Sequence, residues 1–223
     1  VAAFVVSRYS LNAYLWTSLR ISVASWSYHA IAAGDFNNDG RDDIAVGSVD
    51  TAGWAALSLY RLSGSSWQLF GDQRLPVPSA TAVRSVAAGD MDGNGADEAV
   101  IATVDNAQRL AVLAYASPCS GCAMVRVGDW RLNVDYVGLA MGDYDTDGRE
   151  EIAVSSISTA SNQHMLDVAT YQIARTEPVQ VGTAAIATGG PVWVNYARTA
   201  VATGDLDGDG RDDVASVGAV SYT

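Results

Sequence analysis

Four short acidic segments constrain what this 223-residue chain can fold into. They read GDFNNDGRDDIAV, GDMDGNGADEAVI, GDYDTDGREEIAV and GDLDGDGRDDVAS, and each fits the pattern D-x-[DN]-x-[DN]-G-x-x-[DE]. Numbered from its first aspartate, the pattern covers residues 35–43, 90–98, 143–151 and 205–213. Eighteen of the 25 acidic side chains lie in these segments, together with only three arginines. Because carboxylates packed this densely repel one another, a bound cation is needed to compensate them.

The order of the donor groups predicts calcium. Oxygen ligands at positions 1, 3 and 5, a backbone carbonyl at position 7 and a carboxylate at position 9 suit a hard cation of high coordination number. A glycine at position 6 allows the sharp turn. An EF-hand would place its last carboxylate at position 12 between two helices, whereas here it stands at position 9 between short β-type runs. We therefore expect four strand–loop–strand calcium sites.

The predicted ligands are the residues at positions 1, 3, 5, 7 and 9 of each segment. The second segment has one carboxylate fewer at positions 1, 3 and 5 than the fourth, so we expect it to bind more weakly. The alternative is that the segments are merely polar turns. The full set is Asp35, Asn37, Asp39, Arg41, Asp43, Asp90, Asp92, Asn94, Ala96, Glu98, Asp143, Asp145, Asp147, Arg149, Glu151, Asp205, Asp207, Asp209, Arg211 and Asp213.

The segments recur with a period of about 55 residues, which indicates a repeated supersecondary unit. Within one unit, four short runs of β-forming residues are separated by turn residues, at 85–88, 99–103, 110–115 and 124–130. This pattern predicts an all-β chain, a β-propeller of four-stranded blades that forms one domain over residues 1–223.

The two ends of the chain predict how the ring closes. Residues 1–7 and 14–21 have the pattern of outer strands, and residues 201–203 and 214–217 that of the inner strands of one blade. Pairing them would close four blades and leave no open edge. The alternative is that these are four consecutive blades of a larger propeller, because a repeat period does not count blades.

These motifs, followed by Ile-Ala-Val or a similar run, resemble the FG-GAP (VCBS-type) repeats. That family comprises the calcium-binding propeller repeats of integrin α-subunits and of many secreted proteins. The resemblance implies that the loop residues named above bind metal, and that the protein is extracellular and serves in binding or adhesion. It implies no catalytic residue.

A propeller binds its partners where loops converge, so the face opposite the acidic loops is the expected ligand surface. Aromatic rings and arginines predicted there would suit a glycan or a protein loop, although aromatics also pack between blades. The residues are Trp26, Tyr28, Arg84, Tyr136, Trp193, Tyr196 and Arg198. Elsewhere, Cys119 and Cys122 are close enough in sequence for a local disulfide, with free thiols as the alternative.

Composition excludes several functions. All 13 basic residues are arginine, which removes lysine Schiff-base and P-loop chemistry, and the net charge of -12 argues against nucleic acid as a partner. No apolar run is long enough to span a membrane. Because the chain begins at Val1 without a leader pattern, we expect a processed or excised form. His29 and His164 stand outside any catalytic motif.

We therefore expect a secreted, calcium-stabilised propeller that binds a glycan or a protein and is not an enzyme. Two alternatives stay open. One is a structural subunit that assembles with copies of itself into a filament or coat. The other is a carbohydrate-active lyase or hydrolase, in which Tyr136 or His29 would act with Arg84 or Arg198.

Overall fold

The computed structural model describes residues 29–105, 110–116, 125–132, 136–160, 163–174, 177–187 and 196–221. These residues form fourteen β-strands and contain no helix, so none of them belongs to a helix that could cross a membrane. The all-β prediction is confirmed for this part of the chain. The strands are β1 (Ala30–Gly34), β2 (Asp43–Val49), β3 (Trp54–Ser63), β4 (Ser66–Pro78), β5 (Ala80–Gly89), β6 (Glu98–Asp105), β7 (Leu110–Ala116), β8 (Val125–Leu132), β9 (Tyr136–Gly142), β10 (Glu151–Ala160), β11 (Gln163–Ala174), β12 (Glu177–Ala187), β13 (Tyr196–Gly204) and β14 (Asp213–Ser221).

The strands pair in chain order as antiparallel meanders. β1–β4 form sheet I, β5–β8 sheet II and β9–β12 sheet III, while β13 and β14 form the two-stranded sheet IV. This is the strand order of propeller blades. The runs predicted at 85–88, 99–103 and 110–115 lie in β5, β6 and β7, and β8 contains residues 125–130 of the fourth.

Sheet IV confirms that residues 201–203 and 214–217 pair, because Val201 is opposite Ser216 and Thr203 is opposite Val214. The outer strands expected at 1–7 and 14–21 lie outside the described residues. Closure into a four-bladed ring therefore stays a prediction, as does membership of a larger ring.

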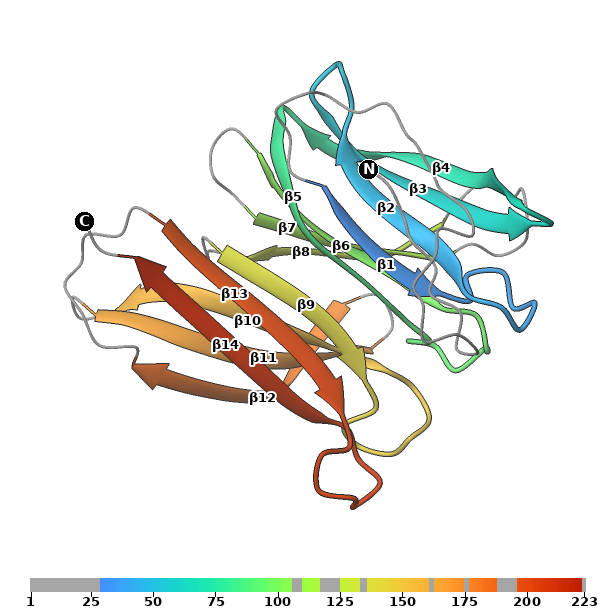
Figure 1. The fold of residues 1–223 in the computed structure, drawn as a ribbon. Helices are drawn as coiled ribbons and strands as arrows, with labels where there is room; N and C mark the ends of the chain where they lie inside the picture. The colour runs from blue at the N-terminus through green and yellow to red at the C-terminus, as the bar shows by residue number, and fades with distance from the viewer. Residues whose placement is uncertain are drawn as a thin grey trace, which may run out of the picture.

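The first strands of the sheets are neighbours: β1 packs against β5, β5 against β9, and β9 against β13 (Figure 1). Two hydrophobic clusters fill the spaces between sheets. One joins sheets I and II and includes Leu59, Val86 and Ile101. The other joins sheets II and III and includes Ala102 and Leu139. The described core thus lies between sheets I and II and between sheets II and III, so these sheets depend on one another for burial.

Close packing of sheets I and II requires a glycine at position 47. A Cβ added to Gly47 would lie 2.7 Å from Val86 Cγ2 and 2.8 Å from Ile101 Cδ1. Both neighbours are buried side chains of the same cluster. The absence of a side chain at Gly47 therefore allows β5 to approach β2.

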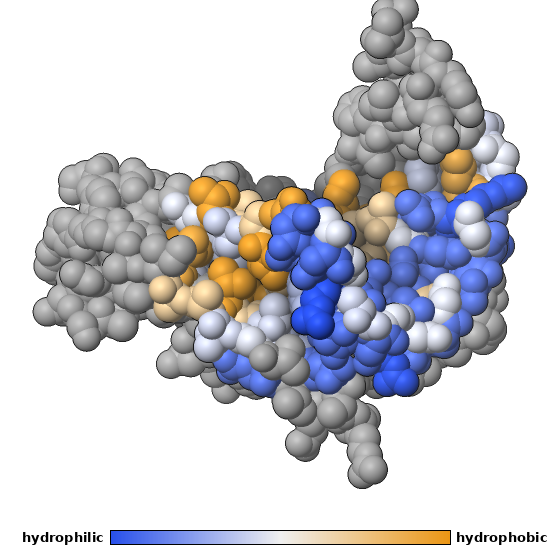
Figure 2. All heavy atoms as spheres, turned by 90° about the horizontal axis from the view of Figure 1, so that it is seen from below, coloured by the Kyte–Doolittle hydropathy of each residue, from blue (hydrophilic) through white to orange (hydrophobic). Residues whose placement is uncertain are grey.

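The four acidic segments connect the first and second strands of their sheets, and Figure 1 shows them in succession along one side of the molecule. We call them loops 1 to 4. Seen from this side, hydrophilic residues cover much of the surface and apolar residues gather beside them (Figure 2). Among the residues that the structure describes, the large apolar side chains that are exposed are Ile31, Leu69, Leu206 and Val217.

Candidate metal centres

The first aspartate closes each loop by accepting backbone hydrogen bonds. Asp35 Oδ1 accepts from Asp39 N at 3.0 Å, and Asp35 Oδ2 from Gly40 N at 2.7 Å. Asp90, Asp143 and Asp205 accept the equivalent pairs at 2.7–3.2 Å. The glycine at position 6 has φ between 81° and 88° in every loop, a conformation that favours glycine over residues with a side chain. The local sequence therefore shapes the loop.

The side chains at positions 3 and 5 are oriented by further bonds inside the loop. In loop 4, Asp207 Oδ1 accepts from Asp209 N at 3.1 Å, and Asp209 Oδ1 accepts from Arg211 N at 2.8 Å. Loops 2 and 3 repeat this arrangement. In the aspartates, one oxygen holds the loop and the second oxygen is the one available to a cation; Asn94 in loop 2 has only one side-chain oxygen, which accepts from Ala96 N.

The acid at position 9 begins the second strand and lies at the base of the loop. Glu98 and Glu151 are each only 1% exposed. Glu98 Oε2 accepts from Met91 N and Glu151 Oε2 from Tyr144 N, both at 2.9 Å, and Asp213 Oδ2 accepts from Leu206 N at 3.0 Å. A backbone N–H thus fixes one oxygen of the position 9 carboxylate in loops 2, 3 and 4.

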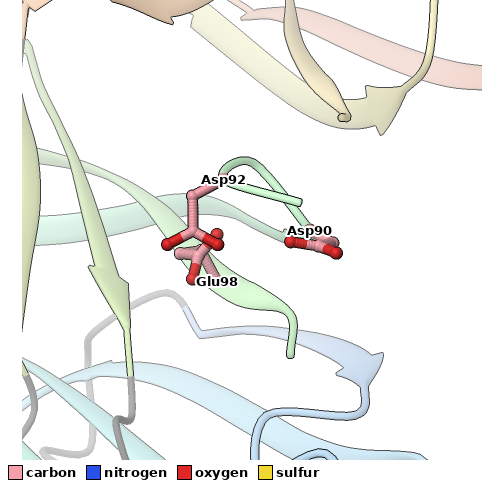
Figure 3. Close-up of side chains that lie close together, drawn as sticks. All are labelled: Asp90, Asp92 and Glu98. Atoms are coloured by element: carbon pink, nitrogen blue, oxygen red, sulfur yellow. The ribbon is translucent and has the colours of Figure 1, made fainter. Parts of the chain in front are cut away.

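These bonds bring the acids at positions 1, 3 and 9 together in three of the loops. One oxygen from each acid lies within 4.8 Å of the others in the groups Asp90, Asp92, Glu98; Asp143, Asp145, Glu151; and Asp205, Asp207, Asp213. Figure 3 shows the first group, with the carboxylates of Asp92 and Glu98 close together and Asp90 facing them. In three of the four loops, the acids predicted at positions 1, 3 and 9 therefore converge.

Loop 2 also contains an unsatisfied buried oxygen. Glu98 Oε1 is buried and has no hydrogen-bond partner. Burial, and to a lesser degree the charges of Asp92 and Asp90, raises the pKa of Glu98 to about 8. A buried carboxylate oxygen without a partner is costly, and a divalent cation would remove both the desolvation and the repulsion. The donor set, which consists only of oxygens, fits a hard divalent ion such as calcium.

In loop 3, a side chain from outside the loop donates hydrogen bonds to the predicted ligands, which the sequence did not reveal. Gln172 Nε2, from β11, lies 3.4–3.5 Å from Asp145 Oδ2, Asp147 Oδ2 and Glu151 Oε1. Burial raises the pKa of Glu151 to about 6, and the charges of Asp145 and Asp147 add to this effect. Gln172 thus contacts three predicted ligands from outside the loop.

A tyrosine that recurs in the third strands could have identified the position of Gln172. Tyr60, Tyr115 and Tyr171 lie in the third strands of sheets I, II and III, each opposite the residue that follows position 9. The next residues along these strands are Arg61, Ala116 and Gln172. In sheets I, II and III, the third strand therefore carries a different residue at this position.

Loop 1 differs from the other three. Asn37, at position 3, donates a side-chain hydrogen bond to Asp43 Oδ2. Burial raises the pKa of Asp43 to about 6, while the Asn37 bond and the positive charge of Arg61 oppose this rise. The position 9 acid of loop 1 thus already has a side-chain donor and a nearby cation. The expected weakness of loop 2 stays a prediction, but the structure distinguishes loop 1 as the divergent loop.

Four of the residues expected on the ligand face lie in strands, and their part in ligand binding stays a prediction. Arg84 lies inside β5, Tyr136 begins β9, and Tyr196 and Arg198 lie in β13, so these four belong to strands and not to connecting loops. The reason is that the first strands pair over a longer stretch than predicted; β13, for example, is already paired at Tyr196, opposite Ser221. His164 lies in β11 and His29 just before β1. Trp26, Tyr28, Trp193, Cys119 and Cys122 are outside the described residues.

Loops 1 and 2 and the strands between them match a known family model. Residues 35–101 match the model of the FG-GAP-like repeat. This segment contains an FG-GAP-like repeat. The match extends from Asp35 in loop 1 to Ile101 in β6, just beyond loop 2. The predicted resemblance is thereby confirmed for this part of the chain, and loops 3 and 4 repeat its hydrogen bonds. No curated protein matches the chain.

Proposed function

We propose that this chain is a calcium-stabilised, propeller-type module that binds a glycan or a protein outside the cell. The FG-GAP-like repeat supports an extracellular binding role, because such repeats are typical of extracellular proteins. The observation that carries the calcium part is the convergent group of Asp90, Asp92 and the buried Glu98, whose Oε1 has no partner.

Calcium suits these loops better than magnesium. Calcium accepts six to eight oxygen ligands in a flexible geometry, whereas magnesium requires a near-ideal octahedron and keeps several waters. A loop with acids or amides at positions 1, 3, 5 and 9 and a carbonyl at position 7 offers many oxygens on a short segment. Extracellular calcium modules have dissociation constants of about 10⁻⁴–10⁻³ M, so such sites fill outside the cell.

In this proposal calcium is structural. Each ion would join the start of a loop to the first residue of the following strand, where Glu98, Glu151 and Asp213 begin β6, β10 and β14. By mass action, one site stabilises the fold by about 1.4 kcal/mol when free calcium is ten times its dissociation constant. Binding of the partner, and not catalysis, is the proposed activity.

Isothermal titration of the chelator-treated protein with calcium tests the metal sites. We expect the wild type to bind at least three ions, and Glu98→Gln to lose one of them. Asp72→Asn is the matched control, because Asp72 is an exposed carboxylate on β4 outside the loops. No binding in the millimolar range, or equal stoichiometry in Glu98→Gln and wild type, would contradict the proposal.

A glycan array probed with and without calcium tests the binding role. We expect retention of one glycan class that is lost when calcium is chelated. If chelation leaves glycan retention unchanged, glycan binding does not depend on the proposed calcium sites. If no glycan is retained, a protein becomes the partner to seek.

A further inference from the structure

The side chain of Gln172 reaches loop 3 from β11, the strand beside the one that follows the loop. The register of the sheet places it there. Tyr171 is opposite Ile152, so the next residue along β11 stands beside Glu151, the acid at position 9. Side chains that stand opposite each other on an antiparallel pair share one face of the sheet. Gln172 and Glu151 therefore meet at the base of loop 3.

The amide of Gln172 faces the oxygens that loop 3 does not use to hold its own shape. Backbone hydrogen bonds of 2.9–3.0 Å occupy Asp145 Oδ1, Asp147 Oδ1 and Glu151 Oε2. The atoms that lie 3.4–3.5 Å from Gln172 Nε2 are the second oxygens of the same side chains, Asp145 Oδ2, Asp147 Oδ2 and Glu151 Oε1. One neutral group thus faces three oxygens available to a cation.

The three distances are alike, and each is longer than the usual N–H···O hydrogen bond of about 2.7–3.2 Å. Gln172 Nε2 is therefore not committed to one carboxylate but is shared among three. The partial positive charge of an amide N–H is small beside the negative charge of three carboxylates. The amide stands where these carboxylates favour a positive charge, and it supplies only part of that charge.

A glutamine can serve a cation from the same place because its amide has two different ends. The nitrogen donates and the oxygen accepts, and the two ends have nearly the same size and shape. A half-turn of the amide would present Oε1 to the same three carboxylates, an arrangement that is favourable only with a cation among them. Calcium takes the amide oxygen of glutamine as a ligand. The oxygen of Gln172 therefore fits a calcium site as well as its nitrogen fits the carboxylates.

The equivalent position differs in the sheets that hold loops 1 and 2. In sheet II it is Ala116, which has no polar side-chain atom, and Glu98 Oε1 in loop 2 is buried without a partner. In sheet I it is Arg61. Burial raises the pKa of Asp43 in loop 1 to about 6, and the positive charge of Arg61 is among the causes that oppose this rise. The third strand thus offers loop 3 an amide, loop 2 a methyl group and loop 1 a guanidinium.

We propose that Gln172 is a ligand of the calcium ion in loop 3, through Oε1, and that the residue at this third-strand position sets how tightly loops 1 to 3 hold calcium. The proposal rests on the calcium sites of the proposed function. Loop 3 has an oxygen ligand that loop 2 lacks, so it binds calcium more tightly than loop 2. Loop 1 binds most weakly, because Arg61 already places a positive charge near Asp43.

Isothermal titration of the chelator-treated protein with calcium tests the ligand. Glu151→Gln removes a ligand of loop 3 and so identifies the loop 3 step in the wild-type titration. Gln172→Met keeps the length of the side chain but has no oxygen, and we expect it to weaken that step about tenfold. Gln180→Met is the matched control, because Gln180 is an exposed glutamine on β12 of the same sheet and its side chain bonds to Gly182 O.

Two exchanges between sheets test the ranking of the loops. Gln172→Arg gives loop 3 the residue of loop 1 and should remove one ion from the stoichiometry. Ala116→Gln gives loop 2 the residue of loop 3 and should tighten the loop 2 step, which Glu98→Gln identifies. Ala116→Met is the control for side-chain size and should not tighten it. Because damage to the fold weakens binding, a gain of affinity in Ala116→Gln cannot come from misfolding.

The outcomes separate this proposal from the proposed function. A wild type that binds no calcium would overturn both. Calcium binding with equal loop 3 affinity in Gln172→Met and wild type would overturn only the role of Gln172. Tighter binding in Gln172→Met would also overturn it, because the amide would then compete with the ion. An Ala116→Gln variant that binds no more tightly than wild type would overturn the ranking.

Discussion

The Asp97 carboxylate accepts a hydrogen bond of 2.7 Å from the backbone N–H of Asp35, which lies 62 residues earlier in the chain. Asp97 is at position 8 of loop 2, and Asp35 is at position 1 of loop 1. The acidic loops are therefore joined to one another directly and are not independent hairpins. A change in one loop should affect the stability of the adjacent sheet.

Removing this carboxylate should destabilise the protein. In Asp97→Ala, the half-buried N–H of Asp35 loses its acceptor, and we expect the free energy of unfolding to fall by about 1–2 kcal/mol. Urea denaturation at neutral pH measures the effect. Asp97→Asn retains a side-chain oxygen and should recover part of the loss. Equal stability of Asp97→Ala and wild type would show that the bond contributes nothing.

A methyl group at position 47 should be poorly tolerated. In Gly47→Ala the new Cβ would lie 2.7–2.8 Å from three side chains of sheet II, and we expect a loss of about 1–3 kcal/mol. The double variant Gly47→Ala, Val86→Ala should be less destabilised than the sum of its single changes, because the second change makes room for the first. Gly71→Ala is the control, because its nearest neighbour would be 3.3 Å away. Strict additivity would show that the two sheets do not meet at this point.

Chelation should lower the melting temperature. If calcium fills the three convergent acid groups as proposed, chelation removes their compensating charge together, and each filled site contributes about 1.4 kcal/mol at tenfold excess calcium. Thermal melts followed by circular dichroism, with chelator and then with calcium restored, measure the change. Magnesium at the same concentration should restore less of the stability than calcium. A melt that is identical in chelator and calcium would contradict structural calcium sites.

The turn between β2 and β3 should make stability depend on acid pH. Asp50 Oδ1 accepts from Ala52 N at 2.8 Å and from Trp54 N at 2.9 Å, and Asp50 also pairs with Arg74. The bond from Trp54 N is the main cause that lowers the pKa of Asp50, and the Arg74 bond and charge add to it. A carboxyl group whose pKa is lower in the folded protein stabilises the fold at pH values above its ordinary pKa of 3.8. This stabilisation is lost as the pH falls through the lower pKa of the folded protein.

Asp50→Asn should therefore be less stable than wild type by about 1 kcal/mol at pH 6, and the difference should shrink towards pH 2.5. Urea midpoints of both proteins at the two pH values measure this difference in stability. Because the acidic loops titrate in both proteins, their contribution cancels in the difference. Asp72→Asn is the control. A difference that is constant with pH would mean that the charge of Asp50 is not involved.

Much of the fold could be predicted because its signals are local. Positions 1, 3, 5, 6 and 9 of each loop interact within nine residues, so spacing alone identifies the loops. The strands beside them follow from runs of β-forming residues, and β5, β6 and β7 lie where those runs are. The positions of Arg84 and Arg198 were less predictable, because the pairing of neighbouring strands sets where a strand begins.

By itself, the sequence determined the four loops, the antiparallel sheets and the acidic character of one side, because these depend on contacts between near neighbours in the chain. Only the tertiary structure decided that Gln172 reaches loop 3, that Asn37 gives loop 1 a different arrangement, and that Asp97 lies over Gly34. These contacts join residues from different strands or different sheets. Their geometry depends on how the sheets pack against one another, which is information that no single segment carries.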